Sequence, residues 1–192
     1  QLLPAGNLRE QKSNASRADV IVITKCPVEF SESEKDGLRN EVRAKENQPI
    51  FFSSIEYGKP FSLFEKEKTI EFFEIESAVL ITGIAASHHL FNYLHSLIPN
   101  LKHEKFYDHH DFSLSELNAI AKKYLNVNER KTVFLTTEKD GVRLFPFRDF
   151  FSSHQLEIYC VPVEVAFSPT EKEKFDSIVL DFVKVKQEEE NL

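Results

Sequence analysis

Short apolar runs alternate with longer segments of helical character along most of the chain. The runs have the β-branched and aromatic content that is typical of buried strands, and they lie at residues 20–24, 50–55, 78–82, 132–137 and 156–165. The other segments are rich in helix formers or place apolar residues at helical spacing, and they lie at residues 31–47, 87–98, 113–124 and 169–183. Strands separated by helices are typical of βαβ units. The pattern therefore predicts an α/β fold, with a parallel sheet and flanking helices.

Local signals set some of the expected boundaries. Ser31 or Ser33 can cap the first predicted helix. Pro162 indicates that the last predicted strand lies at a sheet edge or ends early. Residues 69–75 alternate between apolar and polar, which predicts an edge strand. We expect the boundary between two parts of the chain within residues 56–76.

Composition and charge narrow the class of protein. The 192 residues are 41% hydrophobic and carry a formal net charge of −7, so broad nucleic-acid binding, which depends on neutralising phosphates, is not expected. Cys26 and Cys160 are too few for a disulfide framework and are typical of a reduced, intracellular protein. The longest nearly apolar stretch, at residues 79–86, is too short to span a bilayer. We therefore expect a soluble, cytosolic chain that can still act at a membrane surface.

Three polar clusters follow predicted strands, at residues 24–26, 83–87 and 136–141. In an open parallel sheet, ligands collect at the carboxyl ends of the strands. The small-residue turn at 83–87 leads into a helix whose free N–H groups favour anions, although such a turn also serves tight strand-to-helix packing. The cluster at 136–141 can contribute to a binding site or be a polar loop in which Asp140 is a helix cap.

The segment from Asp108 to Asp111 places two acids around His109 and His110. Carboxylate and imidazole groups can bind a divalent metal ion, or they can form an acid–base pair. The segment can also be a loop in which Asp111 or Ser113 caps the next helix. Several other motifs are absent from the sequence: the phosphate-binding G-x-x-x-x-G-K-[ST] loop, the G-x-S-x-G elbow and any C-x-x-C pair.

Several segments together resemble the tetraacyldisaccharide 4'-kinase family, which makes lipid A. The matching segments occur in the order that the family shows, and they are LLPAGNLRE at 2–10, RAD at 17–19, TGIA at 82–85, FYDHHDF at 106–112, TEKDGVRL at 137–144 and VPV at 161–163. The sequence departs from the family at two places. Asn7 stands where the family usually has proline, and Ala86-Ser87-His88 stands where the family usually has a polar stretch that contains proline. The sequence begins at Gln1 and contains no methionine, so we expect it to be the C-terminal half of such a chain.

The resemblance implies a fold and an activity. The fold is a P-loop NTPase-like core, whose P-loop half is missing here, with a smaller α/β C-terminal domain. The implied division is 1–58 for the last part of the core, 59–186 for the C-terminal domain and 187–192 for an acidic tail. The activity is transfer of the γ-phosphoryl of ATP, with Mg²⁺, to the 4'-hydroxyl of a tetraacyldisaccharide 1-phosphate. It implies work at the cytoplasmic face of the inner membrane of Gram-negative bacteria, on the lipid A precursor and without nucleic acid.

The resemblance also assigns residues. His109 matches a histidine that holds and tunes an aspartate base of the missing half, and Arg9 matches an arginine that would lie near phosphate charge. Asp108, Glu138, Lys139 and Asp140 would line the cleft at the substrate, with separate roles unassigned. No metal ligand and no P-loop residue is expected in this chain, because the family holds ATP and Mg²⁺ mainly with its other half.

Two other functions compete with this interpretation. A DHH-type metal-dependent phosphoesterase shares the letters of residues 108–110 but needs a glycine- and histidine-rich metal segment, and the chain has only five glycines. A non-catalytic α/β binding domain fits the lack of a P-loop. Because phosphoryl transfer depends on positioning and charge neutralisation, we expect the 192 residues alone to be inactive.

Overall fold

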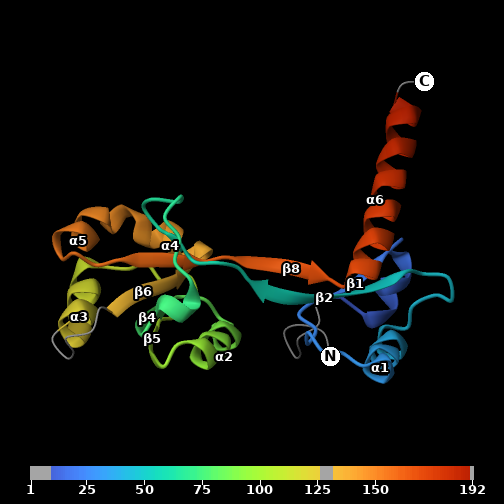
Figure 1. The fold of residues 1–192 in the computed structure, drawn as a ribbon. Coiled ribbons are helices and arrows are strands. Elements are labelled where there is room, and N and C mark those ends of the chain that lie inside the picture. Colours follow the sequence, from blue (N-terminus) through green and yellow to red (C-terminus); the bar gives the residue numbers. More distant parts are fainter. Residues whose placement is uncertain (1–9, 126–131, 191–192) are drawn as a thin grey trace. The chain divides into compact units, whose positions relative to one another are not determined.

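The computed structural model describes residues 10–125 and 132–190 and divides the chain into two compact units. One unit comprises residues 1–56 and 165–192, and the other comprises residues 57–164. The chain crosses from one unit to the other within β2 (Ile50–Tyr57) and again within β8 (Val163–Phe167), which Figure 1 labels. The predicted boundary at residue 58 lies beside this division. The end of the predicted second domain, residues 165–186, groups instead with the first unit.

A five-stranded sheet forms the centre of the unit at 57–164. Its strands, in spatial order, are β3 (Phe61–Ser62), β7 (Ile158–Val161), β6 (Thr132–Thr137), β4 (Ser77–Thr82) and β5 (Asn100–Lys105). Four of them are parallel, and β3 pairs antiparallel with β7. The predicted α/β class with a parallel sheet and flanking helices is confirmed.

Helices pack on both faces of the sheet, because successive side chains of a strand point to opposite faces and each face carries apolar residues. The helices and turns of this unit are η2 (Phe72–Glu74), α2 (His88–Leu97), α3 (Leu114–Leu125), α4 (Glu138–Leu144), η3 (Phe145–Phe147) and α5 (Arg148–Ser153). Leu80 of β4 belongs to the same buried cluster as Leu94 of α2. Its neighbour Ile81 belongs to a second cluster with Leu117 of α3 and Phe151 of α5.

The unit at 1–56 and 165–192 contains a smaller sheet in the order β1-β2-β8. Its elements are η1 (Lys12–Arg17), β1 (Ile21–Ile23), α1 (Glu32–Val42), β2 (Ile50–Tyr57), β8 (Val163–Phe167) and α6 (Pro169–Glu190). A capping box between Ser31 and Glu34 begins α1, as the sequence predicts. The rings of Phe51, Phe167 and Phe175 contact one another. These contacts join β2, β8 and α6 into one core.

Several predicted boundaries are wrong, each for a local reason. The first helix ends at Val42 rather than near residue 47, because Arg43 adopts a left-handed conformation with φ 55°. The edge strand predicted at 69–75 is a single bridge at Thr69 followed by η2. The tail predicted from residue 187 is helical as far as Glu190.

The strand predicted at 156–165 is two strands separated by Pro162. β7 pairs in the five-stranded sheet, whereas β8 pairs in the three-stranded one. The carbonyl of Pro162 accepts a hydrogen bond from Gly58 N at 3.0 Å. Since proline has no N–H to donate, it ends one ladder where the chain leaves for the other.

No helix in the described ranges combines the length and the apolar character that crossing a bilayer requires.

Candidate active site

Parallel pairing brings three chain segments to one edge of the larger sheet. β4, β5 and β6 all end at this edge, with Thr82, Lys105 and Thr137 as their last residues. The turn at 83–87, the DHH loop (residues 106–113) and the start of α4 follow these strands. Two of the three predicted polar clusters therefore meet here, together with the segment around His109.

Asp140 is the buried centre of this edge. Its side chain is fully buried, and its Oδ2 accepts hydrogen bonds from Gly83 N and Thr137 Oγ1, each at 2.9 Å. The Thr137 hydroxyl in turn accepts the Asp140 N–H at 3.1 Å, which makes Thr137 the N-cap of α4. The segment predicted as a binding cluster or a polar loop is thus a helix start. Asp140 ties the turn after β4 to the end of β6.

Arg143 connects this buried carboxylate to His109. Its Nη1 lies 3.2 Å from Asp140 Oδ1, and its Nη2 lies 3.0 Å from His109 Nδ1. Because a guanidinium only donates, His109 Nδ1 must be the acceptor. Neutral His109 therefore carries its proton on Nε2. Arg143, which Asp140 also contacts, sets the tautomer of the imidazole.

The backbone presents the ring of His109 at the surface. His109 has a positive φ of 62°, and its N–H donates to the Gly83 carbonyl at 3.0 Å. Its side chain is 68% exposed, with Nε2 at 3.7 Å from Asp108 Oδ2, beyond hydrogen-bond distance. The other Asp108 oxygen lies 3.7 Å from Lys139 Nζ. The Nε2–H of His109 thus lies near the Asp108 carboxylate without bonding it, and it can donate to an incoming acceptor.

His110 has a different environment. Its Nε2 lies 3.1 Å from Glu116 Oε1, and its ring stacks on Phe106 at a centroid distance of 4.5 Å. Hydrogen bonds from Ser113 to the Glu116 carboxylate, and then the one to His110, hold the pKa of Glu116 below its ordinary value. Ser113 and Glu116 also cap α3. His110 thus holds the loop on α3, whereas the side chain of His109 is exposed to solvent.

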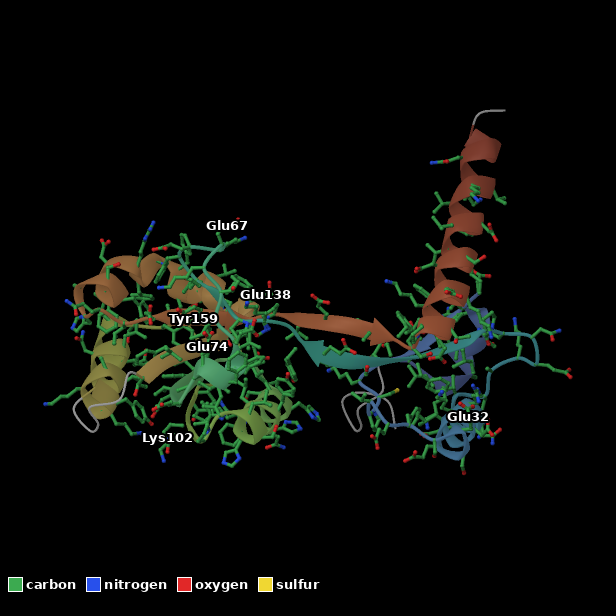
Figure 2. All side chains as sticks on the ribbon, in the orientation of Figure 1. Glu32, Glu67, Glu74, Lys102, Glu138 and Tyr159 are labelled. Carbon is green, nitrogen blue, oxygen red and sulfur yellow. The ribbon has the colours of Figure 1, made fainter. Side chains whose placement is uncertain are left out.

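The predicted site residues are partly brought together. Asp108, His109, Lys139 and Asp140 lie in this cluster. Glu138 lies at the start of α4 (Figure 2) but lines a neighbouring cavity, where its charge adds to burial in raising the pKa of Cys160 to about 11. Arg9 lies outside the described residues.

Arg143 is the functional residue that sequence reasoning missed. It stood in the matched segment, but no role was assigned to it. Its spacing of three from Asp140 and four from Lys139 on a helix would have placed it beside both.

Within residues 10–125 and 132–190, no three or more His, Cys, Asp or Glu side chains are grouped so that they could hold a metal ion. The metal-binding interpretation of Asp108–Asp111, and with it the phosphoesterase alternative, therefore gains no support from the geometry.

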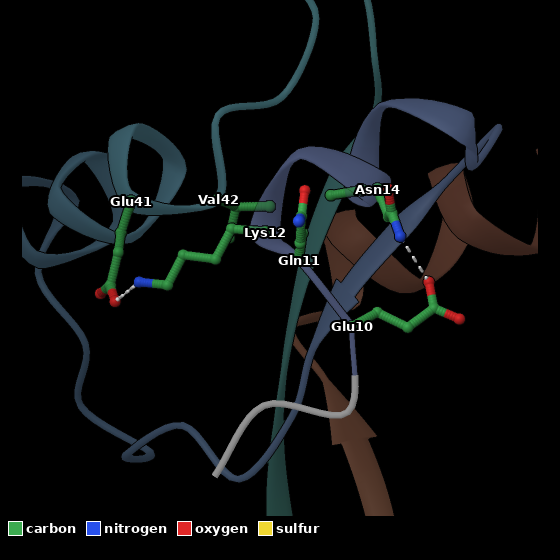
Figure 3. Close-up of a pocket in the computed structure, with 7 residues that line it drawn as sticks. Glu10, Gln11, Lys12, Asn14, Glu41 and Val42 are labelled. Atoms are coloured by element: carbon green, nitrogen blue, oxygen red, sulfur yellow. Dashed lines mark hydrogen bonds and ion pairs between the residues drawn. The ribbon is translucent and has the colours of Figure 1, made fainter. Parts of the chain in front are cut away.

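Another concave site lies in the unit that contains η1 and α1. Its volume is about 440 Å³, and Figure 3 shows the ion pair between Lys12 and Glu41 across it, and Asn14 Nδ2 donating to Glu10 at 3.0 Å. None of the predicted site residues in the described ranges lines it. The cluster around Asp140 is therefore the stronger candidate for chemistry.

Comparisons with known proteins identify the family of the chain. The family model described as tetraacyldisaccharide-1-P 4'-kinase matches residues 1–184. Curated proteins named tetraacyldisaccharide 4'-kinase are similar to the chain: one from Flavobacterium johnsoniae is 37% identical over 185 residues, and one from Phocaeicola vulgatus is 33% identical over 186. Each match covers 95% of this chain but only 50% and 51% of the two relatives. The chain thus spans about half the length of the curated relatives that it matches.

A solved structure supports the fold. The crystal structure of LpxK from Aquifex aeolicus in complex with ATP superposes with a TM-score of 0.56 at 23% identity, covering 91% of this chain and 46% of that one. The family model matches residues 1–184, which is nearly the whole chain. The chain belongs to the tetraacyldisaccharide-1-P 4'-kinase family.

Proposed function

We propose that this chain acts as the C-terminal half of a lipid A kinase. The complete enzyme would transfer the γ-phosphoryl of ATP to the 4'-hydroxyl of a tetraacyldisaccharide 1-phosphate. The observation that carries the proposal is the connection from buried Asp140 through Arg143 to His109 Nδ1. It leaves an exposed, pre-oriented N–H donor at the carboxyl edge of a parallel sheet, where α/β proteins bind their ligands.

In this mechanism His109 is a positioning residue for a carboxylate base. Phosphoryl transfer depends on orientation of the attacking hydroxyl and on neutralising charge. The Nε2–H of His109 would hydrogen-bond an aspartate of the other half, and that aspartate would take the proton of the 4'-hydroxyl. A carboxylate–imidazole pair of this kind keeps the base oriented and ionised until the proton moves.

The remaining predicted residues would surround the substrate. Arg9 would lie near phosphate charge, since a guanidinium can meet two phosphate oxygens at once. Asp108, Lys139 and Glu138 would line the approach to His109. In the described ranges no carboxylate cluster fits a metal ion. As the family resemblance implies, ATP and Mg²⁺ would be bound mainly by the phosphate-binding half, where Mg²⁺ would supply charge neutralisation at the transferred phosphoryl group.

The family assignment also supports a location and a division of labour. A substrate with four acyl chains resides in a membrane, so we place the enzyme at the cytoplasmic face of the inner membrane of a Gram-negative bacterium. The acidic net charge of −7 fits a lipid substrate better than nucleic acid. We propose residues 1–58, together with residues 165–192 that group with them, as the last part of the kinase core, and residues 59–164 as the C-terminal domain.

The test is a chimera in which this chain replaces the matching segment of the Flavobacterium johnsoniae relative. The chimera should phosphorylate a tetraacyldisaccharide 1-phosphate, whereas the 192 residues alone should not. His109→Ala should lower kcat by roughly 10²–10⁴-fold, the range of positioned acid–base groups, with little change in the KM for ATP. His95→Ala, at an exposed histidine of α2, is the matched control. Full activity of the His109 variant, or equal losses in kcat and ATP affinity, would contradict the role given to His109.

A further inference from the structure

A second feature of α4 is an apolar cavity that the activity proposed above does not use. Its volume is about 460 Å³, within the range of small-ligand sites. β3 and the loop after it, α4, η3 and β7 form its walls, all within the unit at 57–164. Lys66 and Glu138 are the charged residues among those lining it, and they are opposite in sign. Most of its wall is therefore hydrocarbon.

Large apolar side chains at the mouth of this cavity are exposed to water. Val142 is 75% exposed and Phe145 is 52% exposed. The ring centroid of Phe64 lies 5.8 Å from that of Phe145 and 5.8 Å from that of buried Phe151. Phe64 therefore connects Phe145 at the mouth to the core. Apolar side chains that surround a hollow, rather than being scattered singly, mark a binding surface.

The floor of the cavity is tightly closed. Gly141 lies so near β7 that a Cβ on it would come within 2.7 Å of Cys160 Sγ and 3.2 Å of Leu63 Cδ1. Cys160 is itself only 2% exposed. The hollow is thus a defined pocket on a packed base and not a gap in the core.

The cavity adjoins the cluster around His109 on the same short helix. Lys139 and Arg143, four residues apart, share the face of α4 that meets the DHH loop. Glu138 and Val142, also four apart, share the neighbouring face and line the cavity. A seven-residue helix is only about 10 Å long. A ligand with its polar end at His109 would therefore reach the cavity with an attached chain.

We propose that this cavity binds one fatty acyl chain of the lipid substrate. The inference rests on the proposed function, because the commitment to an acyl chain comes from a substrate that carries four of them beside the hydroxyl to be phosphorylated. Its chemistry is burial of methylene groups against Phe61, Leu63, Val142 and Phe145, with the sugar left at the polar face of α4. A chain held there would fix the disaccharide relative to His109.

The first arm of the test uses the purified 192-residue chain and free fatty acids. Octanoate, dodecanoate and hexadecanoate compete with a fluorescent fatty acid, and affinity should rise with chain length until the cavity is full. Val142→Arg should weaken dodecanoate binding at least tenfold, and Phe145→Ser should weaken it in the same direction. Since Val142 is exposed, its variant should keep the circular dichroism of the parent. Val165→Arg, at a valine that is 63% exposed and does not line the cavity, is the matched control. Equal binding by Val142→Arg and the control would overturn the proposal.

The second arm uses the chimera to distinguish the substrate's chain from other lipids. Val142→Arg should raise the KM for the tetraacylated substrate at least tenfold and leave the KM for its deacylated analogue unchanged. Fatty-acid binding lost without a change in either KM would identify a site for another lipid and refute the substrate assignment. A parent chimera that turns over neither substrate would refute the proposed function instead, while the first arm would still decide whether the cavity binds acyl chains.

Discussion

Removal of the Asp140 carboxylate tests how the candidate site is held together. The carboxylate is fully buried and receives three donors: Gly83 N, Thr137 Oγ1 and Arg143 Nη1. In Asp140→Ala the buried Gly83 N–H and the half-buried guanidinium of Arg143 lose their acceptor. Breaking one side of a buried ion pair costs about 3–5 kcal/mol, and we expect a loss of free energy of unfolding in that range.

Asp140→Asn separates charge from shape. The amide oxygen can still accept from Gly83 N, but its NH₂ group faces a guanidinium that also only donates. The loss should be that of a charge-assisted hydrogen bond, roughly 1.5–3 kcal/mol, and therefore smaller than for alanine. Asp149→Ala, at an exposed carboxylate of α5, is the control and should change stability by less than about 0.5 kcal/mol.

The assay can follow the relevant unit alone. The chain contains no tryptophan, and all five of its tyrosines lie within residues 57–164. Tyrosine fluorescence during urea unfolding therefore reports the unit that contains Asp140, which matters because two units need not unfold together. A loss of less than about 1 kcal/mol for Asp140→Ala would refute the account of Asp140 as the electrostatic centre of the site. An asparagine variant as stable as the parent would show that the charge has no part in it.

Two further predictions concern packing and pH. Gly83→Ala would place a Cβ 3.1 Å from His110 Cβ and 3.3 Å from the Tyr107 carbonyl oxygen, so it should lower stability by roughly 1–3 kcal/mol in urea unfolding. Gly37→Ala in α1 meets nothing within 4 Å and should instead stabilise its unit by about 1 kcal/mol; a penalty there would contradict the packing argument. Burial, and then the charge of Lys105, lowers the pKa of His103 from 6.5, so the unfolded chain binds the proton first and stability should fall as the pH drops below about 6.5. His103→Gln should flatten that part of the pH profile measured by thermal unfolding, and an unchanged profile would remove His103 as the cause.

Local pattern determined those elements that carry their own periodicity or cap. The β-branched run at 78–82 is β4, Ser31 begins α1, and the apolar spacing of Leu90 and Leu94 places α2 against the sheet. The rule that ligands collect at the carboxyl ends of parallel strands was enough to single out three polar clusters, of which those at 83–87 and 136–141 meet at one edge. These features depend on residues close in sequence, so the sequence contains their signal.

Only the tertiary structure decided the features that depend on distant partners. β5 reads Asn-Leu-Lys-His-Glu-Lys, and it is a strand because β4 supplies its hydrogen bonds while only Leu101 is buried. The two adjacent histidines look equivalent in sequence, yet one contacts Glu116, six positions away, and the other contacts Arg143, 34 positions away. Which nitrogen of His109 holds the proton follows from that second contact. Such a pairing leaves no periodic trace in the chain, because packing and not spacing brings the two side chains together.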